Sequence, residues 1–143
     1  MTVIQRSALL PHPAEAMFEL VTDIEAYPRY MDGCVGAEIL RRGEAMVEAR
    51  LDLSRGGISH SFATRNTMRP HDRIELELLE GPFDRFTGLW QFQRLDAGAC
   101  KVSLDLEFTL RSKVLGAAAA RLFESVTVNL VDALGKRADQ LYG

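Results

Sequence analysis

The side chains that could bind a metal ion are few and scattered along the 143-residue chain. The three histidines, at positions 12, 60 and 71, share no ligand spacing with one another or with Cys34 and Cys100. Structural zinc sites are typically built from pairs of such ligands about two to four residues apart. We therefore expect no metal site, and we expect the two cysteines to be reduced thiols of a reducing compartment.

Side chains that could perform catalysis do not form a recognisable pattern either. His60 lies between Ser59 and Ser61 in a strand-like segment, where successive side chains point to opposite faces, and no serine occurs in a G-x-S-x-G turn. Glu75 and Glu77 alternate with leucines, which indicates a solvent-facing strand surface rather than an acid/base pair. We expect no enzyme activity and no required cofactor; an enzyme would need a polar pair that the sequence does not reveal.

The composition is that of an ordinary globular protein. Hydrophobic residues make up 47% of the chain and charged residues 26%, and the formal net charge is −3. A protein that grips DNA usually has a basic surface, so we expect no DNA partner. The chain shows no signal peptide, no apolar stretch long enough to span a bilayer, no repeat and no linker. We expect a single domain, residues 1–143, in the cytoplasm.

The last thirty residues predict one long helix from Ser112 to Tyr142, with Ser112 as its N-cap. Apolar residues recur there at steps of three, four and seven, which places them on one face of a helix: Leu115, Leu122, Val126, Leu130, Ala133, Leu134 and Leu141. The apolar face of such a helix must pack against another apolar surface to be stable.

That surface is predicted to come from strands that precede the helix. The pattern indicates a first strand over 3–10, a helix over 14–21, and a helical turn after Asp23 that breaks at Pro28. Alternation with period two then predicts strands over 35–41, 45–53, 58–68, 73–78, 83–94 and 101–110, joined by short turns. The fold class is therefore α+β, with a curved seven-stranded antiparallel sheet around a long C-terminal helix.

The inward face of this sheet is rich in aromatic side chains, and one helix covers little area. A hollow is one outcome, and its lining would come from Phe62, Phe86, Trp90, Phe92, Phe123, Val126 and Leu130. A packed core is the other, because protein interiors rarely leave voids. The residue pattern does not decide between the two.

Three stretches resemble a known family. RSALLPHPAEAMFELVTDIEAYPRYMDGC, GGISHSFATRN and EGPFDRFTGLWQF are similar to the coenzyme Q-binding, START-like (SRPBCC) family of polyketide-cyclase-related proteins, over essentially the whole chain. The resemblance implies the helix-grip fold. Residues that match the family's motifs are Tyr27, Pro28, Phe62, Arg65, Gly81, Pro82, Phe83, Trp90 and Phe92. With these motifs and the pattern above, we expect a ligand-binding set of Tyr27, Tyr30, Phe62, Phe83, Phe86, Trp90, Phe92, Phe123, Val126 and Leu130.

The resemblance also implies two functions of different classes. The main expectation is a non-enzymatic carrier or chaperone of ubiquinone or a similar isoprenoid lipid, which supports respiratory electron transport and makes transient contact with the inner membrane. The alternative comes from a bacterial branch of the family whose members bind the large ribosomal subunit and block subunit association. The acidic net charge counts modestly against the alternative.

Overall fold

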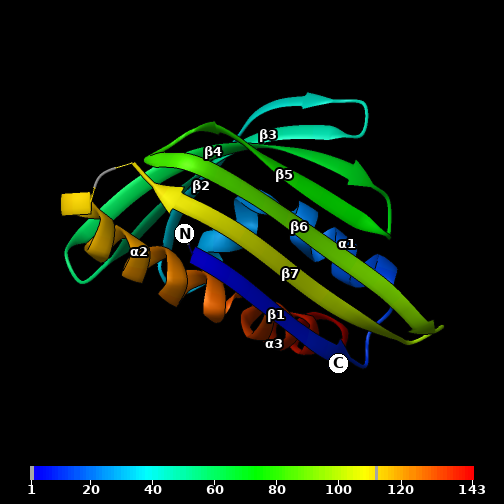
Figure 1. Ribbon diagram of the computed structural model, residues 1–143. Helices are drawn as coiled ribbons and strands as arrows, with labels where there is room; N and C mark the ends of the chain where they lie inside the picture. Colours follow the sequence, from blue (N-terminus) through cyan, green and yellow to red (C-terminus); the bar gives the residue numbers. More distant parts are fainter. Residues whose placement is uncertain (1, 112) are drawn as a thin grey trace.

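The structure, a computed structural model, describes residues 2–111 and 113–143. One strand is followed by two short helices, six further strands and two C-terminal helices (Figure 1). Their bounds are β1 Thr2–Leu10, α1 Ala14–Thr22, the 3-10 helix η1 Ile24–Arg29, β2 Cys34–Gly43, β3 Met46–Arg55, β4 Ile58–Arg69, β5 Arg73–Glu80, β6 Phe83–Asp96, β7 Ala99–Leu110, α2 Lys113–Val128 and α3 Leu130–Tyr142. The predicted strands and α1 agree with these bounds to within two residues at each end.

The seven strands form a single antiparallel sheet in the order β1-β7-β6-β5-β4-β3-β2. The sheet curves around α2 and α3, and α1 covers part of the same face (Figure 1). This arrangement confirms the predicted fold class. It follows from alternation along the strands: in β7, Val102, Leu104, Leu106 and Phe108 are buried, and the residues between them face outward.

The predicted single C-terminal helix is wrong in one respect, because it is broken at Asn129. The Asn129 side-chain amide donates to the Ser125 carbonyl over 2.9 Å, and the Thr127 hydroxyl donates to the Phe123 carbonyl over 2.6 Å. Side chains that bond to the preceding turn in this way compete with the backbone ladder and bend helices. The bend gives the helical region two parts, each with its own packing surface.

The two parts bury different faces. In α2 the buried residues are Ala119, Leu122, Phe123 and Val126, and α3 buries Val131, Leu134, Gly135 and Ala138. Leu141, which the sequence places on the buried stripe, is 49% exposed, although it follows the buried Leu134 by seven residues; it lies in the last turn of α3. The predicted N-cap at Ser112 and the side chain of Leu115 lie outside the described residues.

The β5–β6 hairpin is paired along only part of its length. Its hydrogen-bonded register runs from Arg73–Gln91 to Glu77–Thr87, whereas β6 pairs with β7 from Phe83 to Asp96. An irregularity between Phe83 and Arg85 turns Phe83 and Phe86 to the same inner face, although three positions separate them. This places two phenylalanines from one strand in the core.

Gly88 occupies a crowded point on the inner face of β6. A Cβ atom there would lie 2.7 Å from the Leu106 Cδ2, 2.7 Å from the Leu76 Cδ1 and 3.1 Å from the Leu76 Cβ. Gly88→Ala is therefore expected to lower the free energy of unfolding by about 1–3 kcal/mol, because both leucines must move in a packed core. Guanidinium unfolding monitored by circular dichroism measures the change.

The matched control for this prediction is Gly98→Ala in the β6–β7 turn. The nearest atom to a Cβ at Gly98 is the Asp96 Oδ1 at 3.9 Å, so this substitution should leave the unfolding midpoint nearly unchanged. Equal midpoints for the two variants would show that the close approach at Gly88 does not limit the side chain at that position.

Candidate functional site

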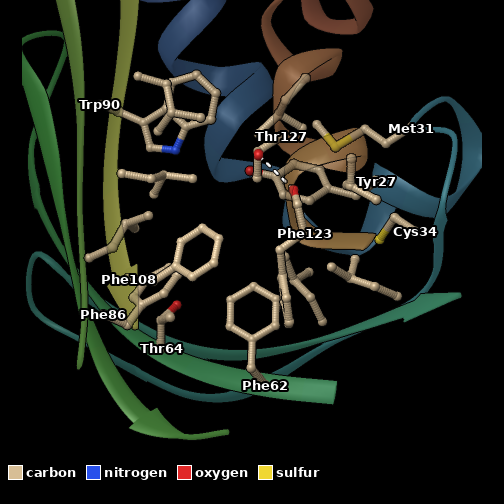
Figure 2. Close-up of a pocket in the computed structure, with 17 residues that line it drawn as sticks. Tyr27, Met31, Cys34, Phe62, Thr64, Phe86, Trp90, Phe108, Phe123 and Thr127 are labelled. Carbon is tan, nitrogen blue, oxygen red and sulfur yellow. Dashed lines mark hydrogen bonds between the residues drawn. The ribbon is translucent and has the colours of Figure 1, made fainter. Parts of the chain in front are cut away.

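An apolar cavity of about 80 Å³ lies between the concave face of the sheet and α2. The sheet contributes Phe86, Trp90 and Phe108 to one side, and the η1–β2 region contributes Tyr27, Met31 and Cys34 to the other (Figure 2). The remaining lining comes from Leu51, Leu53, Phe62, Thr64, Leu76, Leu104, Leu106, Phe123, Val126, Thr127 and Leu130. The sheet and the helices therefore leave a hollow between them, with a mostly apolar wall.

Seven of the ten residues predicted to bind a ligand line this cavity: Tyr27, Phe62, Phe86, Trp90, Phe123, Val126 and Leu130. The structure does not bring Phe83, Phe92 and Tyr30 to the cavity wall. Phe83 is only 1% exposed and lies behind the wall, with its ring centroid 4.8 Å from that of Phe123. The irregularity in β6 points it into the packed core.

Phe92 and Tyr30 lie outside the cavity, in two different surroundings. Phe92 is two residues past Trp90 on the same face, where its ring packs edge-on against Phe18 of α1 at 5.4 Å. Tyr30 lies under the Arg137 guanidinium, which is 5.4 Å from the ring centroid, and lines a separate polar hollow. The same-face pattern of β6 was therefore correct, but it extends further than the cavity does.

Several lining residues were not predicted, and the sequence pattern indicates the orientation of only some of them. Leu104, Leu106 and Phe108 belong to the clear alternation of β7, so their inward orientation could have been read from the sequence. Met31 and Cys34 lie at the turn between η1 and β2, where no periodicity indicates which way a side chain points.

The hydroxyl groups of the cavity wall are engaged with the protein itself. The Tyr27 hydroxyl donates to the Val21 carbonyl, the Thr127 hydroxyl bonds to the Phe123 carbonyl, and the Thr64 hydroxyl lies 2.7 Å from the Asn66 Oδ1. Burial raises the pKa of the Tyr27 hydroxyl and of the Cys34 thiol, which keeps both groups neutral. This wall is suited to holding an apolar molecule, and within the described residues it offers no carboxylate–histidine or carboxylate–carboxylate pair for proton transfer.

Residues 2–111 and 113–143 offer neither a cluster of metal ligands nor a membrane-spanning helix. Within that part of the chain no three histidine, cysteine or acidic side chains gather closely enough to hold a metal ion. No helix described there combines the length and the apolar character that crossing a bilayer requires. Cys34 and Cys100 are free, buried thiols.

The curved sheet, the C-terminal helices it encloses and the apolar hollow between them define a helix-grip, START-like protein. The family model described as polyketide cyclase / dehydrase and lipid transport matches residues 10–134. The chain therefore belongs to the polyketide cyclase / dehydrase and lipid transport family.

Individual relatives divide into two groups by their names. The chain is 42% identical over 142 residues to the ribosome association toxin RatA of Pseudomonas aeruginosa PAO1, and the alignment covers 99% of each chain. It is 22% identical over 138 residues to the mitochondrial coenzyme Q-binding protein COQ10 of Dictyostelium discoideum, and this alignment covers 94% of this chain and 67% of that protein.

A solved structure is similar to this one over nearly its full length. The Zhui aromatase/cyclase from Streptomyces sp. R1128 superposes with a TM-score of 0.86 over 97% of this chain and 94% of that chain, at 19% sequence identity. An identity this low shows a common fold and carries no further conclusion about chemistry. The two curated relatives are not named as enzymes, whereas this structural neighbour is.

Two tyrosines near the cavity differ in how their hydroxyls are satisfied, and this difference yields a stability prediction. The Tyr27 hydroxyl is buried and bonded to Val21, whereas the Tyr30 hydroxyl is buried and has no partner among the described residues. Tyr27→Phe should lower the free energy of unfolding by about 1 kcal/mol, since it removes a buried hydrogen bond. Tyr30→Phe should leave the stability unchanged or slightly raised.

Each variant is the matched control of the other, because both remove one hydroxyl from a tyrosine in the same segment. Urea unfolding followed by the fluorescence of Trp90 gives both values. An equal loss of stability in the two variants would contradict the assignment of a satisfied hydroxyl to Tyr27 and an unsatisfied one to Tyr30.

Proposed function

We propose that this protein binds the large ribosomal subunit and hinders its association with the small subunit. The observation that carries the proposal is the 42% identity to a ribosome association toxin over 99% of both chains, with no major insertion or truncation to separate them. From the sequence alone, the quinone carrier is the main expectation and the ribosomal function is the alternative, and the identity to this toxin favours the ribosomal function. The proposed activity takes place in the cytoplasm, where ribosomes are.

One end of the sheet, where three hairpins turn, offers a surface for ribosomal RNA. The β2–β3, β4–β5 and β6–β7 turns all lie at this end of the strands, on the right in Figure 1, as the strand registers require. Basic residues gather in and beside these turns: Arg41, Arg42, Arg69, Arg73, Arg94 and Lys101. We call these six residues the hairpin-tip cations. Lys and Arg side chains that neutralise phosphates supply most of the affinity of nonspecific nucleic-acid binding. The hairpin-tip cations can therefore contact phosphate even in a protein of net charge −3, although Glu44, Asp72 and Asp96 lie in or beside the same turns.

Some of these cations are already neutralised within the protein. Arg41 lies 3.2 Å from Glu48, Arg69 lies 3.8 Å from Asp72, and Arg73 lies 3.8 Å from Glu75. Within the described residues Arg42, Arg94 and Lys101 form no ion pair. These three are the cations most available to phosphate.

The first test mixes purified small and large subunits with increasing amounts of the protein and separates them on sucrose gradients. We expect the peak of joined ribosomes to fall in proportion to the protein added, and the protein to sediment with the large subunit. Raising the salt concentration should weaken this binding, because phosphate contacts release counterions. An unchanged ratio of subunits to joined ribosomes at saturating protein would remove the proposal.

The contribution of the hairpin-tip cations is tested with the double variant Arg42→Gln, Arg94→Gln. It should bind the large subunit about tenfold more weakly and show a shallower dependence on salt. The control is Arg121→Gln, which removes an exposed cation from α2, away from the hairpin tips. If the control weakens binding as much as the double variant, a different surface of the protein contacts the ribosome.

We propose a second function for the cavity, the binding of an isoprenoid quinone such as ubiquinone, with transient contact at the inner membrane to load or deliver it. The apolar wall and the similarity to a coenzyme Q-binding protein support it. The cavity volume of about 80 Å³ is well below the roughly 300 Å³ at which small-molecule pockets begin. Quinone binding therefore requires the cavity to widen.

The second function is tested by extraction and by fluorescence. Protein from a quinone-containing host is extracted with organic solvent, and the extract is compared with a mock purification by mass spectrometry. Trp90, the single tryptophan, lines the cavity, so a short-tailed ubiquinone should quench its fluorescence saturably. The matching isoprenoid alcohol, which lacks the quinone ring, should compete without quenching. No enriched quinone and no saturable quenching would exclude quinone as the ligand.

A further inference from the structure

A second hollow, of about 390 Å³, lies beside the apolar cavity and has a different character. One wall is the segment from Arg29 to Asp32, at the end of η1, and the other is the break between α2 and α3 together with the first turns of α3. Its polar lining includes Arg29, Asp32, Asn129, Asp132, Lys136 and Arg137. We call this hollow the vestibule.

The vestibule and the cavity share part of their walls. Met31, Val126 and Leu130 line both. In Figure 2 Met31 lies at the side of the cavity next to Tyr27 and Cys34. A polar compartment and an apolar compartment thus meet across three apolar side chains, close to the point where Asn129 breaks the helix.

The vestibule carries unneutralised positive charge. Within the described residues Arg29, Lys136 and Arg137 form no ion pair. One of the two lining carboxylates, Asp32, is already bonded to Arg55. Asp132 is then the one unpaired carboxylate among the described lining residues, against three cations, and the Asp23 carboxylate lies outside the lining but close enough to raise the pKa of the Tyr30 hydroxyl. Such a surplus attracts an anion, and guanidinium groups bind carboxylates and phosphates through directed hydrogen bonds.

Tyr30 adds an unsatisfied donor next to these cations. Its ring lies under Arg137, and its hydroxyl is buried without a partner among the described residues. Burial raises the pKa of this hydroxyl, so it keeps its proton. A buried donor without an acceptor costs free energy, and a ligand oxygen would remove that cost once the side chains that cover the hydroxyl move aside.

We propose that the vestibule binds the anionic head of a single-chain amphiphile, whose apolar chain passes Met31 and Leu130 into the cavity. The proposal rests on the second proposed function, that the cavity accepts an apolar chain, and it specifies the chemistry of the head. A neutral head such as a quinone ring would leave Arg29, Lys136 and Arg137 without a counterion. A carboxylate or phosphate head pairs with them.

The test compares an acid with its own neutral ester. The probe is cis-parinaric acid, an 18-carbon fluorescent fatty acid that accepts excitation energy from tryptophan, and Trp90 in the cavity wall is the donor. Titration with the acid should give saturable energy transfer, and its methyl ester should bind at least tenfold more weakly. Charge-assisted hydrogen bonds of the head account for this difference.

Variants assign the difference to the vestibule. Lys136→Gln combined with Arg137→Gln should weaken the acid about tenfold and leave the affinity for the ester unchanged, and the unchanged ester also shows that the variant is folded. Arg121→Gln, an exposed cation of α2 outside both hollows, should alter neither affinity. Lysophosphatidic acid added as a competitor distinguishes the sources of the anion: displacement of the probe shows that phosphate heads are accepted, and no displacement assigns the site to carboxylates.

The outcomes that overturn the proposal are distinct from those that overturn the cavity function. Equal affinities for acid and ester, or a double variant that binds the acid as tightly as the unaltered protein, would refute the anionic head while leaving a ligand-binding cavity in place. If neither the acid nor the ester binds, the cavity does not accept an apolar chain, and both proposals fail together.

Discussion

The packing of Phe123 against the sheet fixes where the C-terminal helices cross it. From α2 the Phe123 ring reaches Phe62 of β4, Phe83 of β6 and Phe108 of β7, with centroid distances of 5.4, 4.8 and 5.9 Å. These three strands do not all neighbour one another, so a single side chain on the helix holds together parts of the sheet that backbone hydrogen bonds do not join directly. Aromatic pairs at these separations contribute beyond the area they bury.

The same packing leaves the cavity. The aromatic rings fill the space around Phe123, Phe92 packs against Phe18 of α1, and a hollow with a mostly apolar wall is left between Trp90 and Tyr27. Gly88 contributes to this balance, because its missing side chain makes room for Leu76 and Leu106, which form part of the wall. Site and core are therefore built from one set of residues, and a substitution in the wall changes both stability and cavity volume.

Much of the fold could be predicted because its strands alternate cleanly and its turns are short. β7 is the clearest case: every second residue from Val102 to Phe108 is apolar, and all of those are buried. The break at Asn129 was missed because the apolar spacing continues across it, while its cause, the bonds from Thr127 and Asn129 to the preceding turn, depends on side-chain geometry. Periodicity reports which face of an element is buried and does not report where along that face a hollow begins.

This limit explains the outcome for the candidate site. Phe86, Trp90 and Phe92 share a face, as their spacing indicates, but Phe92 meets α1 instead of the hollow. Tyr30, which belongs to the expected ligand-binding set, follows Tyr27 by three residues but lines the vestibule. Its polar neighbours Lys136 and Arg137 lie more than a hundred positions later in the chain, so no local pattern could have associated them.

The partial pairing of β5 with β6 gives the sheet an internal seam. Five residue pairs join these strands, against twelve between β6 and β7, so the hydrogen-bonded ladder separates into one block of β2 to β5 and another of β6, β7 and β1. Regions with fewer shared hydrogen bonds open at lower free energy than the blocks that they connect. Two of the joining pairs, Ile74–Trp90 and Leu76–Gly88, each contribute one residue, Trp90 and Leu76, to the cavity wall. A small rotation of one block against the other would change the hollow's width, so the curvature of the sheet and the capacity of the cavity vary together.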